Sequence, residues 1–527
     1  MEKVKKSKRW FYTLCFMAMN GIDFVRNTQN GDIFSIAANA TGLVLMLIVA
    51  SGYSLKEIHS PFTYIWSISC AGAIVMIIAH ESNHIWGVYR WALVVAVLNV
   101  WWIGVYGKLL LQKIFIQKSL KVRLNPTAWL WIVMTVFMTF SVSQKIWPLW
   151  FFLMFGLFYL TRYEKKDVND MLEGMIDGTI ISFFLLQIYA YGFRPYDELR
   201  YNGAFSNCNI TALHYMLVYA MVLFRLHLLE QKKAKKGWKL FYFLGAAGLL
   251  CFMLLTMGRT AWVGAILMTI MFGVFAVRGV WQKAWWKVLA RGVALVAAGV
   301  LMFPLVFGTV RWLPTILHHP VWYEGEYSVN KVHSFDPADC WKYTEMDEFL
   351  ENVLGRIIRT FQVKSPFALR AYAATNGLEI EIIPMVGPEN MDEGLRSRLA
   401  IYSAYWKDLT WIGNPPTSGY YQLEGTIYHS WHAQNVWLQI AYYFGIPAGI
   451  LFVVMTFVLL WRHFKGMIKN RNWSYAMIPL FICVAFFTYG TMEVVWNVGQ
   501  LVLFLFFFVQ HPAFSEQRYM EEQPSCS

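Results

Sequence analysis

Apolar runs of about 20 residues recur along most of this 527-residue chain, and no other feature constrains its fold as strongly. An α-helix of that length crosses roughly 30 Å of hydrocarbon. Hydrophobic residues make up 57% of the chain and charged residues only 15%, whereas an average soluble chain is about 25% charged. A large soluble helical core would instead alternate apolar and polar faces. The sequence therefore predicts an all-α polytopic membrane protein with about 12–14 transmembrane helices.

Fourteen candidate spans can be drawn, and they leave one long segment outside the hydrocarbon. The predicted spans are 10–28, 33–55, 62–80, 86–107, 127–143, 145–161, 171–193, 211–229, 238–256, 260–277, 288–310, 436–461, 475–490 and 493–511. The first is the weakest, because Asp23 and Arg26 lie in its second half. The expected organisation is a transmembrane bundle at 1–310, an extracytoplasmic loop domain at 311–435, C-terminal transmembrane helices at 436–511 and a cytoplasmic tail at 512–527.

The short basic loops indicate the orientation. With the N-terminal "MEKVKKSKR" in the cytoplasm, loops such as "RYEKK", "RLHLLEQKKAKKGWK" and "RHFKGMIKNR" all fall on the cytoplasmic side, as the positive-inside rule requires. Most of the net charge of +13 is then cytoplasmic and attracts anionic membrane lipids. No nucleic-acid-binding motif is present, so nucleic acid is not an expected partner. The sequence predicts a multi-pass membrane protein with a cytoplasmic N-terminus and an uncleaved first span.

The segment 311–435 is long enough to have structure of its own. Residues 345–363 carry apolar side chains at helical spacing and predict an amphipathic helix, which lies either on the membrane surface or across the bundle. A second helix is expected over 395–413, and 378–386 alternates weakly, as in a short hairpin strand. The large loop is therefore expected to be mostly helical.

Polar residues cluster where the predicted spans meet the outer face. Arg259 stands between two spans, either as an interfacial snorkelling residue or as an anion ligand, because guanidinium binds phosphate bidentately. Arg200 and Asn209 stand ahead of a predicted helix start, where Asn can cap and where phosphate can bind. Arg398 and Tyr402 share a helix face at i and i+4. Together these residues outline a candidate anionic site.

Two histidines stand at the edge of a predicted span. His429 and His432 share a face if the segment is helical, but zinc needs at least a third ligand and no H-E-x-x-H is present, so no metal is expected. The remaining interpretations are a structural N-cap region and a histidine that binds substrate or accepts a proton. Glu173, Asp177 and Glu493 form a competing signal, because carboxylates within spans often mark ion or proton paths.

These motifs, in this order, resemble those of the O-antigen ligase and O-antigen polymerase superfamily of bacterial membrane glycosyltransferases. The resemblance covers about residues 170–460 and is carried by "RYNGAFSNCN" with Arg200 and Asn209, "GRTAW" with Arg259, "RLAIYSAYWKDLTWIGNPPTSG" with Arg398 and Tyr402, and "HAQNVWLQIAYYFGIPAG" with His432 and Asn435. The chain departs from the family at Cys208, where proline is common, and at 364–393, which looks like an insertion.

The resemblance implies a glycosyltransferase that uses neither a metal nor a cofactor. Its donor would be a glycan on undecaprenyl diphosphate, and its acceptor a sugar hydroxyl of a polysaccharide or glycolipid. The implied catalytic residues are His432 as general base, with Arg259 and Arg398 stabilising the diphosphate. The implied substrate-binding residues are Arg200, Asn209, His429, Asn435 and Tyr402. Polymerase and ligase are not separated, and the rivals are a small-anion transporter and a protein O-glycosylating ligase.

The basic loops yield a topology prediction. In Lys235→Cys, the new thiol should stay unlabelled by a membrane-impermeant reagent in intact cells, because the loop 230–237 is expected inside. A cysteine placed within 311–435 should be labelled and serves as the control. Labelling at 235 in intact cells would contradict the orientation.

Overall fold

The computed structural model describes residues 8–28, 41–46, 48–50, 52, 58–80, 87–116, 124–143, 146–161, 163, 165–193, 200–205, 207–279, 284–316, 321–323, 332–334, 346–361, 381–386, 393–415, 418–424, 429–430, 432–470, 473–493 and 500–515. The helices of the first 316 residues are α1 (Arg9–Thr28), α4 (Pro61–His80), α5 (Gly87–Leu111), the π-helix η1 (Gln112–Ile116), α6 (Pro126–Phe140), α7 (Ile146–Leu160), α8 (Lys165–Phe193), α9 (Cys208–Gln231), α10 (Lys236–Leu255), α11 (Arg259–Gly279) and α12 (Trp286–Ile316).

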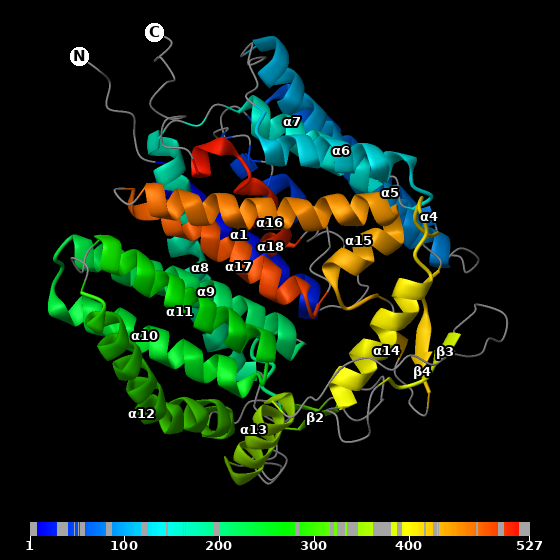
Figure 1. The fold of residues 1–527 in the computed structure, drawn as a ribbon. Helices are drawn as coiled ribbons and strands as arrows, with labels where there is room; N and C mark the ends of the chain where they lie inside the picture. Colours follow the sequence, from blue (N-terminus) through cyan, green and yellow to red (C-terminus); the bar gives the residue numbers. More distant parts are fainter. Residues whose placement is uncertain are drawn as a thin grey trace, which may run out of the picture.

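The rest of the chain combines short strands with helices. Strands β1 (Val321–Tyr323) and β2 (Val332–Ser334) pair with each other, and β3 (Glu381–Ile383), β4 (Tyr421–Leu423) and β5 (His429–Ser430) form a second small sheet. The helices are α13 (Met346–Phe361), α14 (Glu393–Lys407), α15 (Val436–Phe444), α16 (Ile446–Lys469), η3 (Ser474–Met477), α17 (Ile478–Gly490), α18 (Leu501–Phe508) and η4 (Pro512–Phe514). The long helices lie side by side, and α14 and its sheet lie beyond one end of them (Figure 1).

Eight helices in the described part of the chain are long and apolar enough to cross a membrane, and 41–50, α6, α7 and the stretch 474–490 are shorter apolar helices. Their outward faces are apolar as well: on α12, Leu289 is 73% exposed and Leu301 is 81% exposed. Such faces would be unfavourable in water and suit contact with hydrocarbon. The chain is therefore an all-α polytopic membrane protein, as its sequence predicts.

Three predicted elements differ in the structure. The span predicted at 436–461 is broken into α15 and α16, because Gly445 adopts a φ of +95°. The helix expected to end at Gly413 ends at Lys407. The strand β3 pairs in parallel with β4, so it is not part of a hairpin. Of the predicted spans 33–55 and 493–511, the structure describes the helical stretch 41–50 and the helix α18.

The first helix is a packed member of the bundle. A Cβ at Gly174 of α8 would lie 2.8 Å from the Thr13 backbone nitrogen, and one at Gly178 would lie 2.7 Å from the Thr13 carbonyl oxygen. Glycines four residues apart let two helices approach closely, as membrane helices commonly do. Backbone contact of this kind fixes α1 against α8, but α1 is not among the eight described helices that are long and apolar enough to cross a membrane.

A cluster of four charged side chains also holds α1 in place. Arg225 of α9 donates to Glu173 at 2.9 Å and to Asp177, and Arg9 of α1 donates through Nε to Asp177 at 2.7 Å. The hydroxyl of Tyr475 donates to the other oxygen of Glu173 at 2.5 Å. Two guanidinium groups therefore balance the two carboxylates. This pairing gives Glu173 and Asp177 a structural role in the bundle.

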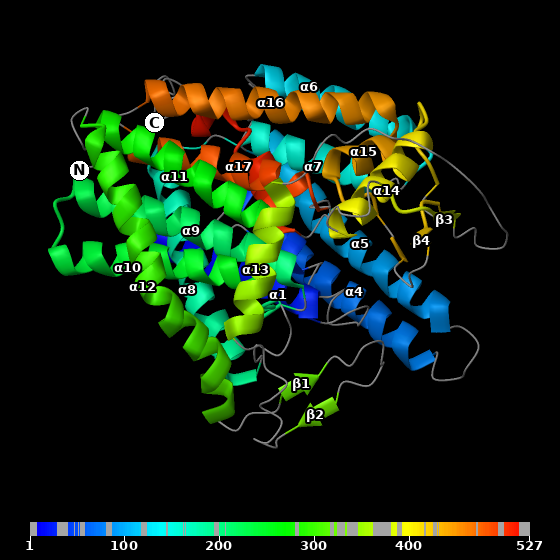
Figure 2. The same ribbon diagram turned by 60° about the horizontal axis from the view of Figure 1, so that its bottom comes forward.

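The amphipathic helix α13 covers the end of α12. Its Phe349 is fully buried and stacks on Phe303, with ring centroids 5.5 Å apart, and also contacts Phe307. Figure 2 shows α13 lying beside α12, with β1 and β2 beyond it. These ring contacts place α13 against α12.

The charge cluster predicts unequal effects for its two arginines. Arg225→Met should destabilise the protein strongly, by about 3–5 kcal/mol, because it leaves two carboxylates without their buried partner. Arg9→Met should cost less, since the Arg9 side chain is 42% exposed and that of Arg225 only 11%. Thermal unfolding in detergent measures both, and adding Glu173→Gln to Arg225→Met should restore part of the loss. Equal effects of the two arginine variants would contradict the cluster.

Candidate functional site

The carboxylate of Glu493 joins segments that are far apart in the sequence. Glu493 lies in the turn after α17, outside the spanning helices, and its Oε1 accepts from Asn209 Nδ2 at 2.5 Å and from Arg398 Nη2 at 3.3 Å. Asn209 Oδ1 in turn accepts from Arg200 Nη2 at 2.6 Å. The chain Arg200–Asn209–Glu493–Arg398 is called the polar cluster below. Three of its members were predicted as site residues, and the fourth came from the competing signal.

Local capping and turn geometry position Arg200 and Asn209. Asn207 is the N-cap of α9, and its side chain accepts from the Asn209 backbone nitrogen at 2.8 Å. Gly203 has a φ of +56°, and a Cβ there would lie 2.7 Å from the Tyr215 hydroxyl, so the turn requires glycine. Arg200 Nε donates to the Thr256 carbonyl at 2.9 Å, which ties this turn to the end of α10.

Arg259 belongs to the same turn that receives Arg200. It is the first residue of α11 and follows Thr256 by three positions. Met257, between them, has a φ of +51°, a conformation that costs a non-glycine residue of order 1 kcal/mol and is often retained for function. A Cβ at Gly258 would lie 2.9 Å from Ala212 of α9. The backbone of Arg259 therefore lies close to Arg200 of the polar cluster. That the two arginines serve one site remains a prediction.

Tyr402 and Asn435 connect α14 to the ends of α15 and α17. The Tyr402 hydroxyl lies 3.0 Å from the Gln434 carbonyl and 2.9 Å from the Thr491 carbonyl. Asn435 Nδ2 donates to the same Thr491 carbonyl at 3.2 Å, and its Oδ1 caps α15 by accepting from the Leu438 nitrogen at 3.0 Å. Thr491 is two residues from Glu493, so both predicted residues adjoin the polar cluster.

The two histidines do not share a helix face. His429 lies in β5, paired with Gln422, while α15 begins only at Val436, so the expectation of a helical i, i+3 pair is wrong. His432 Nδ1 accepts from the Gln434 backbone nitrogen at 3.3 Å. With Nδ1 so occupied, the neutral ring carries its proton on Nε2. Burial lowers the pKa of His432, so the ring is neutral at neutral pH.

Electrostatics set the protonation of Glu493. Burial raises the pKa of its carboxyl group, and the positive charges of Arg398 and Arg200 oppose that rise. Its side chain is 22% exposed, so the group remains within reach of solvent. The Glu493 carboxylate accepts directly from Arg398 and is linked to Arg200 through Asn209. These hydrogen bonds fix the positions of the two guanidinium groups. The site as a whole can therefore present positive charge to an anion while keeping each arginine oriented.

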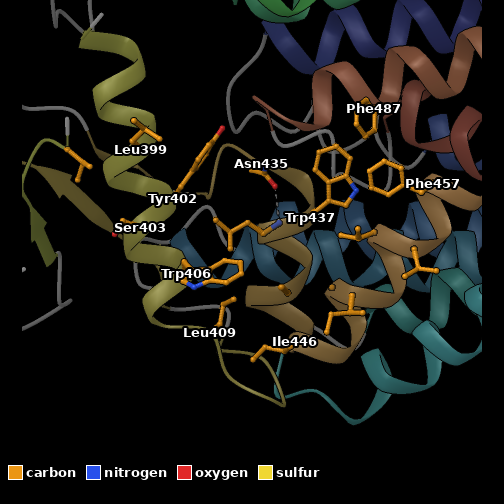
Figure 3. A pocket seen from close by; sticks show the side chains of 17 residues that line it. Leu399, Tyr402, Ser403, Trp406, Leu409, Asn435, Trp437, Ile446, Phe457 and Phe487 are labelled. Atoms are coloured by element: carbon orange, nitrogen blue, oxygen red, sulfur yellow. Dashed lines mark hydrogen bonds between the residues drawn. The ribbon is translucent and has the colours of Figure 1, made fainter. Parts of the chain in front are cut away.

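An apolar groove of about 860 Å³ begins at this site and runs between α14, α15, α16 and α17. Tyr402 and Asn435 line one side of it, between Leu399 and the aromatic side chains of Trp437, Phe457 and Phe487 (Figure 3). The α16 side chains that line it are themselves on an outward face, since Ile450 is 57% exposed and Phe457 is 55% exposed. The groove is therefore open toward the hydrocarbon and has polar side chains along one side.

Two glycines make the break that shapes this groove. A Cβ at Gly413 would lie 2.0 Å from the Tyr443 carbonyl oxygen, and one at Gly445 would lie 2.2 Å from the Trp411 carbonyl oxygen. The Asn414 nitrogen donates to Tyr442 O at 2.9 Å, so the backbone freed at the break is hydrogen-bonded across it. Irregular backbone is tolerated at membrane depth where it is satisfied by protein or lines a cavity.

Comparison of the chain with protein-family models, with curated proteins and with solved structures finds no match. Within the described residues, no group of three or more His, Cys, Asp or Glu side chains gathers as a metal site would. The positive charge of the polar cluster comes from the guanidinium groups of Arg200 and Arg398. What this site can bind therefore has to be inferred from the arrangement of these groups.

The lowered pKa of His432 yields a stability prediction. The folded protein binds a proton at His432 less readily than the unfolded chain, whose pKa is near 6.5, so stability is lost as the pH falls below that value. In His432→Asn, the Oδ1 atom can still accept from Gln434 but does not titrate. Unfolding temperatures of the two proteins should differ progressively below about pH 6.5 and little above pH 7. A constant difference across pH 5–8 would contradict burial of a neutral ring.

Proposed function

We propose that the chain is a membrane glycosyltransferase of the O-antigen ligase and polymerase type. It would move a glycan from undecaprenyl diphosphate to a hydroxyl of a cell-surface polysaccharide or glycolipid acceptor. The observation that carries the proposal is that Tyr402 and Asn435 line the apolar groove and also bond the Thr491 carbonyl, two residues from Glu493 of the polar cluster. A substrate that fits both must have an anionic head and a long hydrocarbon chain, and a polyprenyl diphosphate has both.

The arginines suit the leaving group. Transfer breaks the bond between the anomeric carbon and the diphosphate oxygen, and the electron pair leaves with the diphosphate. Guanidinium groups stabilise that developing charge through bidentate hydrogen bonds, and fixed donors do so without reorganising. Arg259 and Arg398 are assigned this task, with Arg200 and Asn209 completing the binding surface. Glu493 orients Arg398 and prevents three positive charges from repelling one another in a partly buried site.

The acceptor hydroxyl must lose its proton as its oxygen bonds to the anomeric carbon. His432 is our candidate base, because its lowered pKa keeps it neutral. Its Nδ1 accepts from the Gln434 amide in the free protein, so to act as base that atom would exchange the amide for the acceptor hydroxyl. The second candidate is Glu424 or another carboxylate of the large loop. The products are a glycoside and undecaprenyl diphosphate.

Lipid and polysaccharide analysis of a deletion strain tests the proposal. Accumulated lipid-linked single repeats would identify a polymerase, and full-length lipid-linked polymer that never reaches its acceptor would identify a ligase. Loss of glycan from protein alone would identify the protein O-glycosylating ligase. Unchanged glycans of every kind would contradict the proposal and favour the small-anion transporter.

The arginine assignments yield a kinetic prediction. Arg398→Ala should lower turnover by about 10²–10³-fold, the usual cost of removing one charge-stabilising donor. Arg259→Lys should be nearly as damaging, because an ammonium group cannot form the bidentate contact. Lys407→Ala, at the exposed end of the same helix as Arg398, is the matched control and should be active. Full activity of Arg259→Lys, measured on purified lipid-linked donor, would reduce Arg259 to an interfacial charge.

A further inference from the structure

A second groove lies at the opposite end of the bundle. It has a volume of about 340 Å³ and is enclosed by α9, α10, α11 and α12. Asn209 is near the start of α9 and Glu230, which lines the groove, is near its end. At 1.5 Å per residue these positions are roughly 30 Å apart, about the thickness of the hydrocarbon layer. The second groove is therefore separate from the polar cluster and from the groove beside it.

The second groove combines an apolar interior with charge at one end. Its walls include Leu223, Phe243, Phe272 and Leu295, and its charged members are Lys239, Glu230 and Arg291. Arg291 forms an ion pair with Glu230. The charged side chains that line the groove are therefore one carboxylate and two cations, and their net charge is positive. Exposed lysines of the α9–α10 turn add to this charge; they are Lys232, Lys233, Lys235 and Lys236.

Tryptophans mark the depth of the charged end in the membrane. Trp238 is 56% exposed, and Trp285 and Trp286 are 56% and 68% exposed. Exposed tryptophan beside lysine is typical of the level of the lipid headgroups. Trp238 immediately precedes Lys239, while Leu289 and Val293 continue α12 with exposed apolar side chains. The charged end of the groove thus lies at headgroup level, and its apolar walls extend toward the acyl chains.

We propose that this groove binds one anionic phospholipid. The phosphate lies against Lys239 and Arg291, and one acyl chain fills the space between α9, α11 and α12. Charge complementarity selects an anionic headgroup over a zwitterionic one, since each nearby cation contributes about fivefold in affinity. The site does not depend on the glycosyltransferase proposal, because it uses none of the same residues.

Two glycines allow a steric test of the same groove. Gly292 of α12 lines it, and a Cβ built there meets no atom within 4 Å, so a larger side chain can enter the groove without a clash at its base. Gly299 lies seven residues farther along α12 with equally open space, but outside the groove. Gly292→Leu should fill the acyl-chain space, whereas Gly299→Leu is a matched control for the effect of a leucine on the helix.

Native mass spectrometry of the full-length protein in detergent, titrated with phosphatidylglycerol or phosphatidylcholine, tests the proposal. Wild type should retain one phosphatidylglycerol at least tenfold more tightly than phosphatidylcholine. Gly292→Leu should lose this tight binding, and Gly299→Leu should keep it. Lys239→Ala should weaken phosphatidylglycerol about fivefold, and Arg291→Ala by more, because it also exposes the charge of Glu230. Lys236→Ala, whose side chain does not line the groove, should weaken phosphatidylglycerol clearly less than Lys239→Ala does.

Three results would overturn the proposal. Equal affinity for the two lipids would remove the headgroup selection, and unchanged binding by Gly292→Leu would remove the groove as the site. Displacement of phosphatidylglycerol by millimolar inorganic phosphate would reassign the cations to a free anion. Thermal unfolding of each variant identifies any loss of binding that comes from misfolding.

Discussion

The hydrogen bonds of Glu493 are the interaction on which the organisation of the site depends. Asn209 and Glu493 are 284 residues apart in sequence, yet their side chains are within 2.5 Å. The carboxylate also accepts from Arg398 of α14, so the start of α9, the end of α17 and the large loop meet at one group. An unpaired charge in this partly buried position would be costly, so each segment stabilises the placement of the others. Removing Glu493 would leave two arginines facing each other across the site.

The irregular backbone around this cluster follows from the same constraint. In hydrocarbon, backbone groups are satisfied within helices, and breaks occur only where protein supplies other partners. Gly445 interrupts the helix, and the carbonyl of Tyr442, two residues before the end of α15, accepts from the Asn414 backbone instead. Gln434 and Met257 hold positive φ angles beside the cluster, at 48° and 51°. These departures from regular structure lie together at one end of the bundle, next to the candidate site.

Much of this arrangement could be predicted from the sequence, and the reasons differ by residue. Arg200, Asn209 and Arg398 each lie at a helix end or on the large loop, so topology alone brings them to one face. Glu493 could not be assigned in the same way, because a carboxylate in an apolar segment fits an ion path equally well. Pairing across 284 positions depends on tertiary packing, which no local pattern encodes.

The break at Gly445 was available in the sequence but was outweighed by the apolar run around it. The stretch "FGIPAG" contains a glycine and then Pro447 at the second position of the new helix, a common helix end followed by a helix start. The residues on both sides of Gly445 are mostly apolar over 436–461. A prediction based on the length of the apolar run therefore gives a single span. Hydropathy reports the solvent that a segment prefers and carries no information on its backbone angle.

That break also explains why polar residues precede an apolar helix at 429–435. Because α15 is a separate helix from α16, its N-terminal end can lie beside the apolar groove, where the N-cap Asn435 is part of the lining. Asn435 therefore has two roles. It lines the apolar groove, and its side chain donates a hydrogen bond to Thr491, in the turn that contains Glu493. His432 is three residues away and neutral. An amphiphilic substrate bound along the groove would have its anionic end next to these groups, as the proposed transfer requires.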